Sequence, residues 1–402
     1  MTWKAVLLAE IADISLGKML DKAKNKGEPL PYLANINVRW GDFDLEDLRT
    51  MRFEAHELER YSLNAGDIVM CEGGEPGRCA LWRDHHHRMM LQKALHRIRP
   101  APQTADSTYL YYYFLNTGKQ NGFAPYFTGS TIKHLPREQL AKFPIRLPSL
   151  SKQQRIGAAL SSYDNLITTN QRRITLLEEA SRLIYREWFV RLRFPGRESI
   201  ALKNGIPENW KKANLFEICA VNYGYPFKST HFNSTKTGTP AVRIRDIPDI
   251  STSTYTTEVV DDTYKIDRGD FLIGMDGIFH MNHWIGPKAY LVQRVCKVRP
   301  EDEKLLAYIG LALRDPIKTF ETTIQGATVA HLGAKHLKQI EINVPVGLDE
   351  ELGILNDLLW QQIHLREMNM QLAQARDLLL PKLMSGQIDV SNIQLPDEDV
   401  VT

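Results

Sequence analysis

One unit of sequence occurs twice in this chain, and this duplication constrains the fold more than any other feature. Five short segments recur in the same order in both halves. They are Trp3-Lys4 with Trp210-Lys211, Gly66-Asp67 with Gly269-Asp270, Arg99-Pro100 with Arg299-Pro300, His134-Leu135 with His331-Leu332, and Pro148 with Pro345. The shift between partners falls from 207 to 197 residues, which small loop insertions and deletions produce. A single globular domain, duplicated, explains all five matches.

Each half ends in a segment rich in helix formers, which follows Pro148 or Pro345. Apolar residues recur there at alternating steps of four and three, the heptad spacing of paired helices. The predicted seam of the first helix is Ile156, Leu160, Tyr163, Ile167, Asn170, Ile174, Leu177, Ser181, Ile184 and Trp188. The predicted seam of the second is Ile354, Leu358, Gln361, Leu365, Met368, Leu372, Ala375 and Leu379. We expect the helices to pair along these seams, with the polar Asn170 fixing the register. The alternative is that each helix packs on its own domain.

The repeat and the two seams predict an α+β fold. Two repeated globular domains are separated by two long antiparallel helices that form a coiled-coil strut. Halves related by a two-fold axis perpendicular to the helices place those helices antiparallel. The predicted globular domains are residues 1–150 and 205–347, and the predicted helical regions are residues 151–194 and 348–386. At 1.5 Å per residue, a helix from Ile156 to Trp188 spans roughly 50 Å.

Composition excludes several classes of protein. The chain has no apolar stretch long enough to cross a bilayer and no signal peptide after Met1, so we expect a cytoplasmic protein without a membrane partner. The four cysteines are too far apart for Cys-x-x-Cys zinc or redox spacing, which predicts small buried hydrophobic side chains. They are Cys71, Cys79, Cys219 and Cys296. The net charge of +2 argues neither for nor against nucleic acid.

Three segments resemble specificity subunits of type I restriction-modification systems. Residues 183–196 (LIYREWFVRLRFPG) resemble the family's central region, residues 378–386 (LLLPKLMSG) its terminal helix, and residues 206–210 (IPENW) the opening of its second target-recognition domain. The resemblance implies that two target-recognition domains supply DNA sequence specificity to methyltransferase subunits, which use S-adenosylmethionine to methylate adenine. It also implies a restriction translocase subunit, dependent on ATP and Mg²⁺, where the system includes one.

The sequence motifs of catalysis are absent from the chain. It has no G-x-x-x-x-G-K-[ST] phosphate loop, no G-x-G-x-x-G cofactor fingerprint and no Asn/Asp-Pro-Pro-Tyr/Phe methyltransferase motif. Residues 84–88 (DHHHR) hold three consecutive histidines that point in different directions, so we interpret them as a polar hairpin tip rather than a metal site. Residues 302–304 (DEK) fit a solvated turn better than a nuclease site. We therefore expect no catalytic residue, metal or cofactor on this chain.

Two pairs of matched segments carry side chains suited to DNA. The first pair has the hydroxyl and basic groups of a helix start that binds phosphate, with a structural cap as the alternative. Its residues are Ser130, Thr131, Lys133 and His134 in one half, and Thr328, His331 and Lys335 in the other. The second pair alternates polar with apolar residues, as a half-buried strand presenting amides and guanidinium groups to bases does, with ordinary surface polarity as the alternative. Its residues are Asn35, Asn37 and Arg39 in one half, and Arg243 and Arg245 in the other.

These expectations describe a non-enzymatic protein that recognises a bipartite sequence in double-stranded DNA and directs methyltransferase subunits, with restriction subunits where present, to it. Two readers on a rigid strut should leave the bases between the half-sites unread. Three alternatives stay open: a specificity subunit of a methylation-only assembly, a scaffold or adaptor whose domains bind proteins, and a self-sufficient nuclease, which the missing motifs disfavour. DNA binding that falls steeply with salt would exclude the adaptor.

Overall fold

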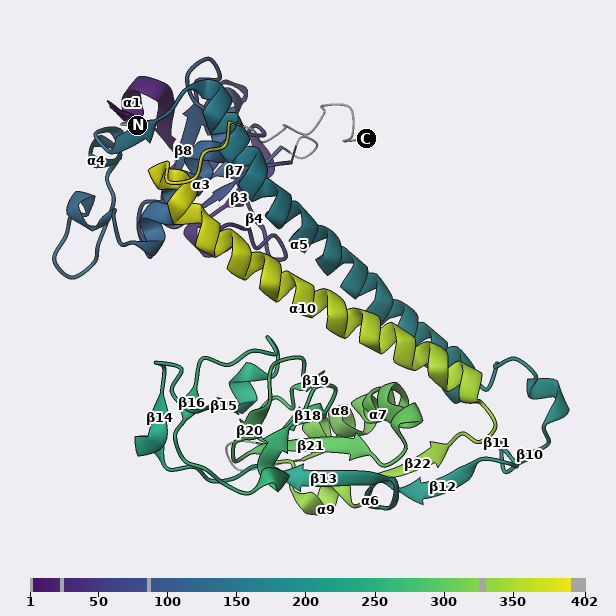
Figure 1. The fold of residues 1–402 in the computed structure, drawn as a ribbon. Coiled ribbons are helices and arrows are strands. Elements are labelled where there is room, and N and C mark those ends of the chain that lie inside the picture. The colour runs from purple at the N-terminus through teal and green to yellow at the C-terminus, as the bar shows by residue number, and fades with distance from the viewer. Residues whose placement is uncertain (1–2, 22–24, 85–87, 325–329, 392–402) are drawn as a thin grey trace. The chain divides into compact units, whose positions relative to one another are not determined.

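The computed structural model describes residues 3–21, 25–84, 88–324 and 330–391. The chain divides into two compact units, Met1–Leu166 with Leu372–Thr402, and Ile167–Gln371. Both long helices run through this boundary, because α5 (Leu150–Tyr185) and α10 (Asp349–Ser385) each contribute one part to each unit (Figure 1). Each unit therefore holds one globular domain together with a stretch of both helices.

The domain of the first unit is built on three sheets. The strand order of the first sheet is β2 (Ala12–Leu16), β8 (Leu95–Pro100), β5 (Ile68–Cys71) and β6 (Cys79–Leu81). That of the second sheet is β4 (Arg49–Phe53), β3 (Glu28–Leu33) and β7 (Met90–Leu91). The third sheet pairs β1 (Lys4–Leu7) with β9 (Pro144–Leu147). The helices are α1 (Leu8–Ile11), α2 (Leu58–Tyr61), α3 (Ser107–Lys119) and α4 (Arg137–Ala141). Asp106 caps α3 by accepting a hydrogen bond from the backbone N–H of Tyr109 at 2.8 Å. This helix buries Tyr109, Leu110 and Phe114 in the core of the domain.

The domain of the second unit repeats this topology. The strand order of one main sheet is β13 (Cys219–Tyr223), β21 (Val295–Pro300), β18 (Phe271–Gly274) and β19 (Met281–His283). That of the other is β14 (Phe232–Asn233), β16 (Tyr255–Thr256), β15 (Thr239–Val242), β20 (Ala289–Leu291) and β17 (Lys265–Ile266). Two smaller pairs are β12 (Lys211–Asn214) with β22 (Glu341–Val344), and β10 (Leu202–Lys203) with β11 (Ile206–Pro207). The helices are α6 (Leu215–Ile218), α7 (Leu306–Ala312), α8 (Arg314–Thr323) and α9 (Ala334–Leu337). Even the parallel pair β3–β7 has its counterpart in β15–β20, so the predicted duplication is confirmed.

The repeated Gly-Asp and Arg-Pro segments form the same structural contact in both units. Asp67 is 1% exposed and accepts hydrogen bonds from Nε and Nη2 of Arg99, both at 2.7 Å. Asp270 accepts one from Nη1 of Arg299 at 3.2 Å. Each aspartate also accepts a hydrogen bond from the backbone N–H three residues before it, at 2.7 and 2.8 Å. Because each aspartate precedes one strand and its arginine lies on the neighbouring strand, these residues hold the sheet together.

A buried histidine makes the stability of the first unit depend on pH. His96 on β8 is fully buried, and its Nε2 donates a hydrogen bond to the carbonyl oxygen of Leu135 at 2.7 Å. Burial, aided by the charge of Arg137, lowers the pKa of His96 from 6.5 to about 4. The unfolded chain therefore binds this proton more readily. The stabilising contribution of neutral His96 is present above pH 6.5 and is lost as the pH falls towards 4, a loss of about 3 kcal/mol.

Urea unfolding of the full chain at several pH values checks this prediction. The free energy of unfolding should fall between pH 6.5 and pH 4, and His96→Gln should make that fall shallower. His56→Gln is the matched control, because His56 is exposed and should leave the pH dependence unchanged. A pH dependence that is identical in wild type and His96→Gln contradicts the assignment.

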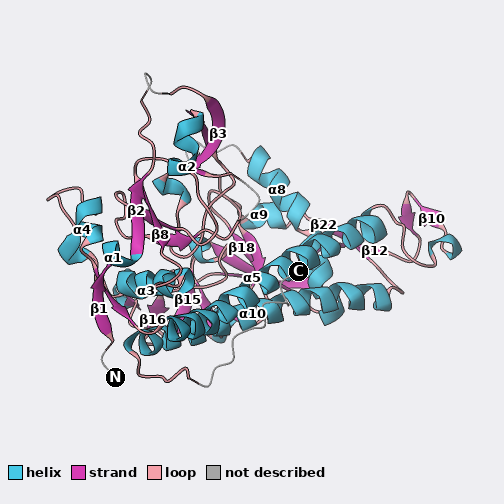
Figure 2. Cartoon of the chain, turned by 90° about the horizontal axis from the view of Figure 1, so that it is seen from above, coloured by secondary structure: helices cyan, strands magenta, loops and turns pink. Residues whose placement is uncertain are grey.

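The long helices α5 and α10 lie side by side in both views (Figures 1 and 2), yet many of their apolar residues pack on the globular domains. The residues that join the core of the first domain are Ile156, Leu160, Leu380, Leu383 and Met384. Those that join the core of the second domain are Leu352, Leu355, Leu359 and Ile363. The alternative prediction, a helix packed on its own domain, is confirmed for Ile156 and Leu160 of α5 and for the start of α10, whereas the end of α10 packs on the first domain.

Several direct contacts between the two helices are polar. In the second unit, Nδ2 of Asn170 donates a hydrogen bond to Oδ1 of Asn369 at 3.0 Å. Eleven residues further along α5, Oγ of Ser181 accepts a hydrogen bond from Nε2 of Gln362 at 3.1 Å, and Gln362 precedes Asn369 on α10. The helices are therefore antiparallel, as predicted.

The predicted seam of the second helix is wrong at Gln361 and Met368, each by one residue, and at Ile354. Asn369 and Gln362 face α5, whereas their predicted neighbours Met368 and Gln361 are exposed. Ile354 is 44% exposed and lies outside the helix interface. Of the other predicted residues of this seam, Leu365 is buried and Leu358 and Leu372 are half-buried. On the first helix, Ile156, Leu160, Asn170 and Ile174 are buried, and Ile167 and Leu177 are half-buried. Counting apolar residues missed Gln362 and Asn369 because their amide groups, and not apolar side chains, face α5 at these two positions.

All four cysteines are free and buried, as predicted. Over the part of the chain that the structure describes, every helix is too short or too polar to cross a membrane.

Candidate nucleic-acid interface

In the first unit, one loop gathers side chains that lie far apart in the sequence. This loop joins β5 to β6, and its Gly73 forms a backbone bridge with His134. A Cβ atom on Gly73 would lie 3.0 Å from Nδ1 of His134. One on Gly74, whose φ is 81°, would lie 2.7 Å from Nδ2 of Asn35. Glycine at both positions lets these side chains approach the loop closely, so Asn35 and His134 meet at one place.

The segment that leads to His134 is a tight turn and not the start of a helix. Thr128 and His134 exchange two backbone hydrogen bonds, at 2.8 and 2.9 Å, and Gly129 turns the chain with a φ of 88°. Helix α4 begins only at Arg137. The predicted phosphate site at a helix N-terminus is therefore wrong here, because the turn closes on itself before Pro136. The side chains of the turn remain exposed; they are Ser130, Thr131, Lys133 and His134.

An open groove beside this loop carries functional groups that sequence reasoning missed. It is lined by Trp40, Glu75, Phe123, Phe127, Thr131 and Lys133. Trp40 is 41% exposed, and its Nε1 donates a hydrogen bond to Oε1 of Glu75 at 2.6 Å. Nη1 of Arg78 donates to the other oxygen of Glu75 at 2.8 Å. An exposed ring and an oriented carboxylate suit stacking on a base and acceptance of a hydrogen bond from its amino group. Tryptophan usually lies in the core, so composition alone gave no signal.

The prediction for the second group of polar residues in the first unit needs correction. Asn35, Ile36 and Asn37 form a 3-10 helix, η1 (Asn35–Asn37), and not a half-buried strand. Asn37 is 5% exposed, its Oδ1 accepts from the N–H of Ala34 at 3.0 Å and its Nδ2 donates to a carbonyl oxygen at 3.1 Å. Asn37 therefore shapes the backbone and does not face a ligand. Arg39 is exposed and pairs with Asp44 at 2.9 Å.

The matching segment of the second unit has the same form with different chemistry. Arg243 precedes the 3-10 helix η7 (Ile244–Asp246), so the prediction of a strand is wrong here too. The guanidinium of Arg243 lies 4.3 Å from the centre of the Phe232 ring. Burial and the charge of Arg245 lower the pKa of Arg243. Arg245 is exposed and 3.9 Å from Asp246, which leaves its guanidinium available to a ligand.

A loop equivalent to that of the first unit follows β18 and meets His331. Asp276 forms a backbone bridge with His331, and its Oδ1 lies 2.6 Å from Nδ1 of the same residue. The guanidinium of Arg294 lies 3.3 Å from both ring nitrogens of His331, and its Nε is 3.4 Å from the Asp276 carboxylate. Arg294 has a φ of 73°, a conformation that L side chains rarely adopt. Lys335 is exposed on α9, and Thr328 lies outside the described residues.

Each unit thus presents exposed polar side chains at equivalent loops, where the connection after β5 or β18 meets the segment containing His134 or His331. Within the described ranges, histidine, cysteine and carboxylate side chains do not gather in threes to hold a metal ion. The fold thus holds two similar candidate binding surfaces, one in each domain, which is the arrangement of a recognition protein.

The chain belongs to the type I restriction modification DNA specificity domain family, whose model matches residues 1–179 and 207–365. This result confirms the resemblance seen in the sequence, and the family supplies DNA sequence specificity rather than catalysis.

Relatives and a solved structure agree with this membership. The type I restriction enzyme EcoBI specificity subunit of Escherichia coli is 30% identical over 141 residues, which are 35% of this chain and 30% of that protein. The type I restriction enzyme MjaIX specificity subunit of Methanocaldococcus jannaschii is 24% identical over 305 residues, which are 71% of this chain and 70% of that protein. The crystal structure of a type I restriction-modification system S subunit from M. genitalium shares the fold, with a TM-score of 0.59 and 16% identity over 95% of this chain and 96% of that chain.

Proposed function

We propose that this chain recognises a bipartite sequence in double-stranded DNA, one half with each globular domain, and directs methyltransferase subunits to it. The observation that carries the proposal is the duplicated site, in which the same loop meets the same segment in both domains. The side chains at the two sites differ, so the two half-sites should differ in sequence.

The chemistry at each site suits a different set of contacts. In the first domain, Asn35 and Glu75 are groups that pair with base edges, while Thr131 and Lys133 suit phosphates. In the second domain the exposed groups are mainly cationic; they are Arg245, Arg294, His331 and Lys335. Because guanidinium groups favour guanine, the second half-site should contain at least one G·C pair that the first does not need.

Exposed apolar residues on the long helices supply a surface for partner subunits. In the second unit, Leu176 and Leu183 of α5 lie one heptad apart and are 64% and 55% exposed. On α10, Ile354 and Met368, two heptads apart, are 44% and 37% exposed. Heptad-spaced apolar side chains on a helix surface fit a partner helix. We assign this surface to the methyltransferase subunits, which would carry S-adenosylmethionine, with ATP and Mg²⁺ on a restriction translocase subunit where one is present.

Mapping of methylated positions tests the proposed function. DNA is incubated with the full chain and its methyltransferase subunit, and the modified adenines are located by sequencing. The expected result is a two-part sequence with a gap of fixed length and free composition. Methylation at one short uninterrupted sequence contradicts the proposal. Binding of the full chain to DNA should also weaken steeply as salt rises, which an adaptor for proteins would not show.

The chain without partner subunits is expected neither to methylate nor to cleave DNA, because its sequence lacks the motifs of both reactions. Transfer of a labelled methyl group from S-adenosylmethionine and nicking of supercoiled DNA with Mg²⁺ are the two measurements. Adding the methyltransferase subunit to the same preparation serves as the positive control. Methyl transfer by the chain alone, at a level above a preparation without protein, would show that it is an enzyme.

Arg294 is expected to read a base in the second half-site. A strained backbone and contacts to both His331 and Asp276 fix its guanidinium, which is the arrangement needed for a bidentate contact to guanine. Arg294→Ala should lower discrimination at one base pair by about 1–3 kcal/mol and leave the first half-site unchanged. Competition binding with duplexes altered at single positions measures this effect.

Lys288→Ala is the matched control, because Lys288 is an exposed cation of the same domain outside the loop site. It should weaken binding to all duplexes alike or leave it unchanged. If Arg294→Ala also weakens all duplexes to the same extent, Arg294 contacts phosphate and not a base.

A further inference from the structure

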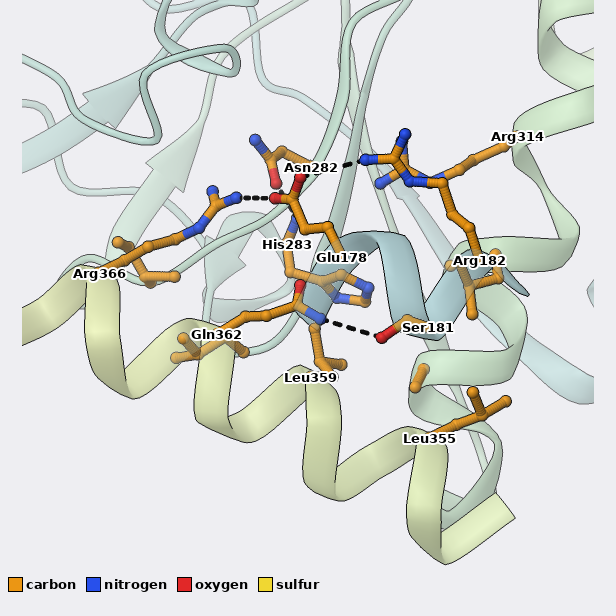
Figure 3. Close-up of a pocket in the computed structure, with 15 residues that line it drawn as sticks. Glu178, Ser181, Arg182, Asn282, His283, Arg314, Leu355, Leu359, Gln362 and Arg366 are labelled. Atoms are coloured by element: carbon orange, nitrogen blue, oxygen red, sulfur yellow. Dashed lines mark hydrogen bonds and ion pairs between the residues drawn. The ribbon is translucent and has the colours of Figure 1, made fainter. Parts of the chain in front are cut away.

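A cavity in the second unit collects three arginines around a single carboxylate (Figure 3). It has a volume of ≈ 50 Å³ and lies among α5, α7, β19 and α10, with Arg314 at the start of α8. A space of this size holds about three or four water molecules or one small ion. Its charged residues are Glu178, Arg182, Arg314 and Arg366.

One carboxylate does not neutralise three guanidinium groups. Glu178 forms ion pairs with Arg182, at 3.1 Å, and with Arg366. Arg314 has no hydrogen bond or ion pair among the described residues, and its Nε is buried. The Nε of Arg366 is also buried without a partner. Burial and the nearby charge of Arg182 lower the pKa of Arg314, but a guanidinium stays protonated at neutral pH. The side chain of Arg182 is 56% exposed, so the uncompensated positive charge of the cavity lies on Arg314, where burial makes it unfavourable.

The neutral groups around the cavity leave that charge in place. Nδ1 of His283 donates a hydrogen bond to the carbonyl oxygen of Gly269 at 2.9 Å, and burial lowers its pKa from 6.5 to about 4, so it is neutral at pH 7. Nε2 of Gln362 is bound to Ser181. Glu178 is the one carboxylate among the described residues that line the cavity.

We propose that this cavity binds an oxyanion of the phosphate class, with Arg314 and Arg366 as its principal ligands. The two side chains come from α8 and α10 and point towards Glu178 from different directions (Figure 3). A tetrahedral oxyanion presents oxygens in several directions and accepts hydrogen bonds from both guanidinium groups. A ligand with a planar carboxylate would fit less well, because a single guanidinium can engage both of its oxygens. Glu178 competes with the anion for the same arginines. The inference goes beyond the proposed function and does not depend on base recognition by the loops.

Titration of the full chain with inorganic phosphate tests the proposal, with binding measured by calorimetry and by the rise in melting temperature. Wild type should bind one phosphate per chain. Arg314→Gln should weaken binding about tenfold or more, because a charge-assisted contact is lost. Glu178→Gln should strengthen binding, because the competing carboxylate is removed. Arg172→Gln, an exposed arginine of the same helix α5, is the control and should leave binding unchanged.

Equal phosphate binding by wild type, Arg314→Gln and Glu178→Gln overturns the proposal, as does the absence of binding to wild type. If Arg314→Gln does not fold, Arg366→Gln and Glu178→Gln supply the opposite shifts. Competition with a duplex of mixed sequence distinguishes the sources of the anion. If DNA displaces phosphate, the natural ligand is a phosphate of the DNA backbone. The slope of the DNA-binding constant against salt, on logarithmic axes, should then be smaller by about one in Arg314→Gln. Phosphate binding that DNA leaves unchanged identifies free phosphate.

Discussion

Exchanging residues 205–347 for the corresponding segment of a related specificity subunit is expected to replace one half of the recognised sequence and to leave the other half unchanged. Each domain has its own sheets, its own core and its own loop site, so the base contacts that we propose for it should not depend on the other domain. Each mismatched base pair costs about 1–3 kcal/mol, so the change of half-site should be complete rather than graded. Sequencing of methylated DNA measures the result.

The structure sets the design of this exchange. Leu355 and Leu359 of α10 belong to the core of the second domain, so the donor segment must fit them. The reciprocal exchange of residues 1–150 is the matched control and should alter only the other half-site. A chimaera that changes both halves at once would show that the domains do not read independently.

Asp67→Ala is expected to have the largest effect on stability of any single change considered for the first domain, a loss of about 3–5 kcal/mol in the free energy of unfolding. The carboxylate of Asp67 is buried and accepts two hydrogen bonds from Arg99 and one from the backbone. Its removal leaves the guanidinium of Arg99 without its anion beside the core. Urea unfolding of the full chain at pH 7, followed by a probe in the first domain, measures the loss.

Asp13→Ala is the control for this change, because Asp13 also pairs with an arginine of β8 but its side chain is 62% exposed. Its partner Arg97 keeps hydrogen bonds to the carbonyl oxygens of Glu59, Arg60 and Ser62. An exposed pair of this kind contributes about 1 kcal/mol or less. Equal destabilisation by both changes would mean that burial of the Asp67–Arg99 pair does not matter.

The duplication and the two helices were predictable because they leave periodic or repeated patterns in the sequence. The five matched segments include Asp67 with Asp270 and Arg99 with Arg299, and the structure shows that these repeat because they hold equivalent strands together. Some of the matched segments therefore recur because they stabilise the domain. Another, His134 with His331, recurs because it forms the loop site.

The local structure of the candidate site was predicted poorly. Alternation of polar and apolar residues around Asn35 and Arg243 indicates a strand, but both segments form 3-10 helices. Trp40 and Arg294 have no sequence signature that separates them from a core tryptophan and an ordinary surface arginine. The roles that we propose for them rest on contacts with Glu75 and His331, each more than thirty residues away.

The sequence by itself determined the duplicated α+β architecture, the existence of two long helices and the absence of catalytic motifs, because repetition, period and motif are local properties that can be counted along the chain. Only the tertiary structure decided which stripe of α10 faces α5, since Asn170 and Ser181 find amide partners there that a count of apolar residues does not detect. It also decided that Asn35 and His134 approach the same loop and that Arg314 shares a cavity with Glu178. These meetings join segments about a hundred residues apart, and no local pattern in a chain records a contact at that separation.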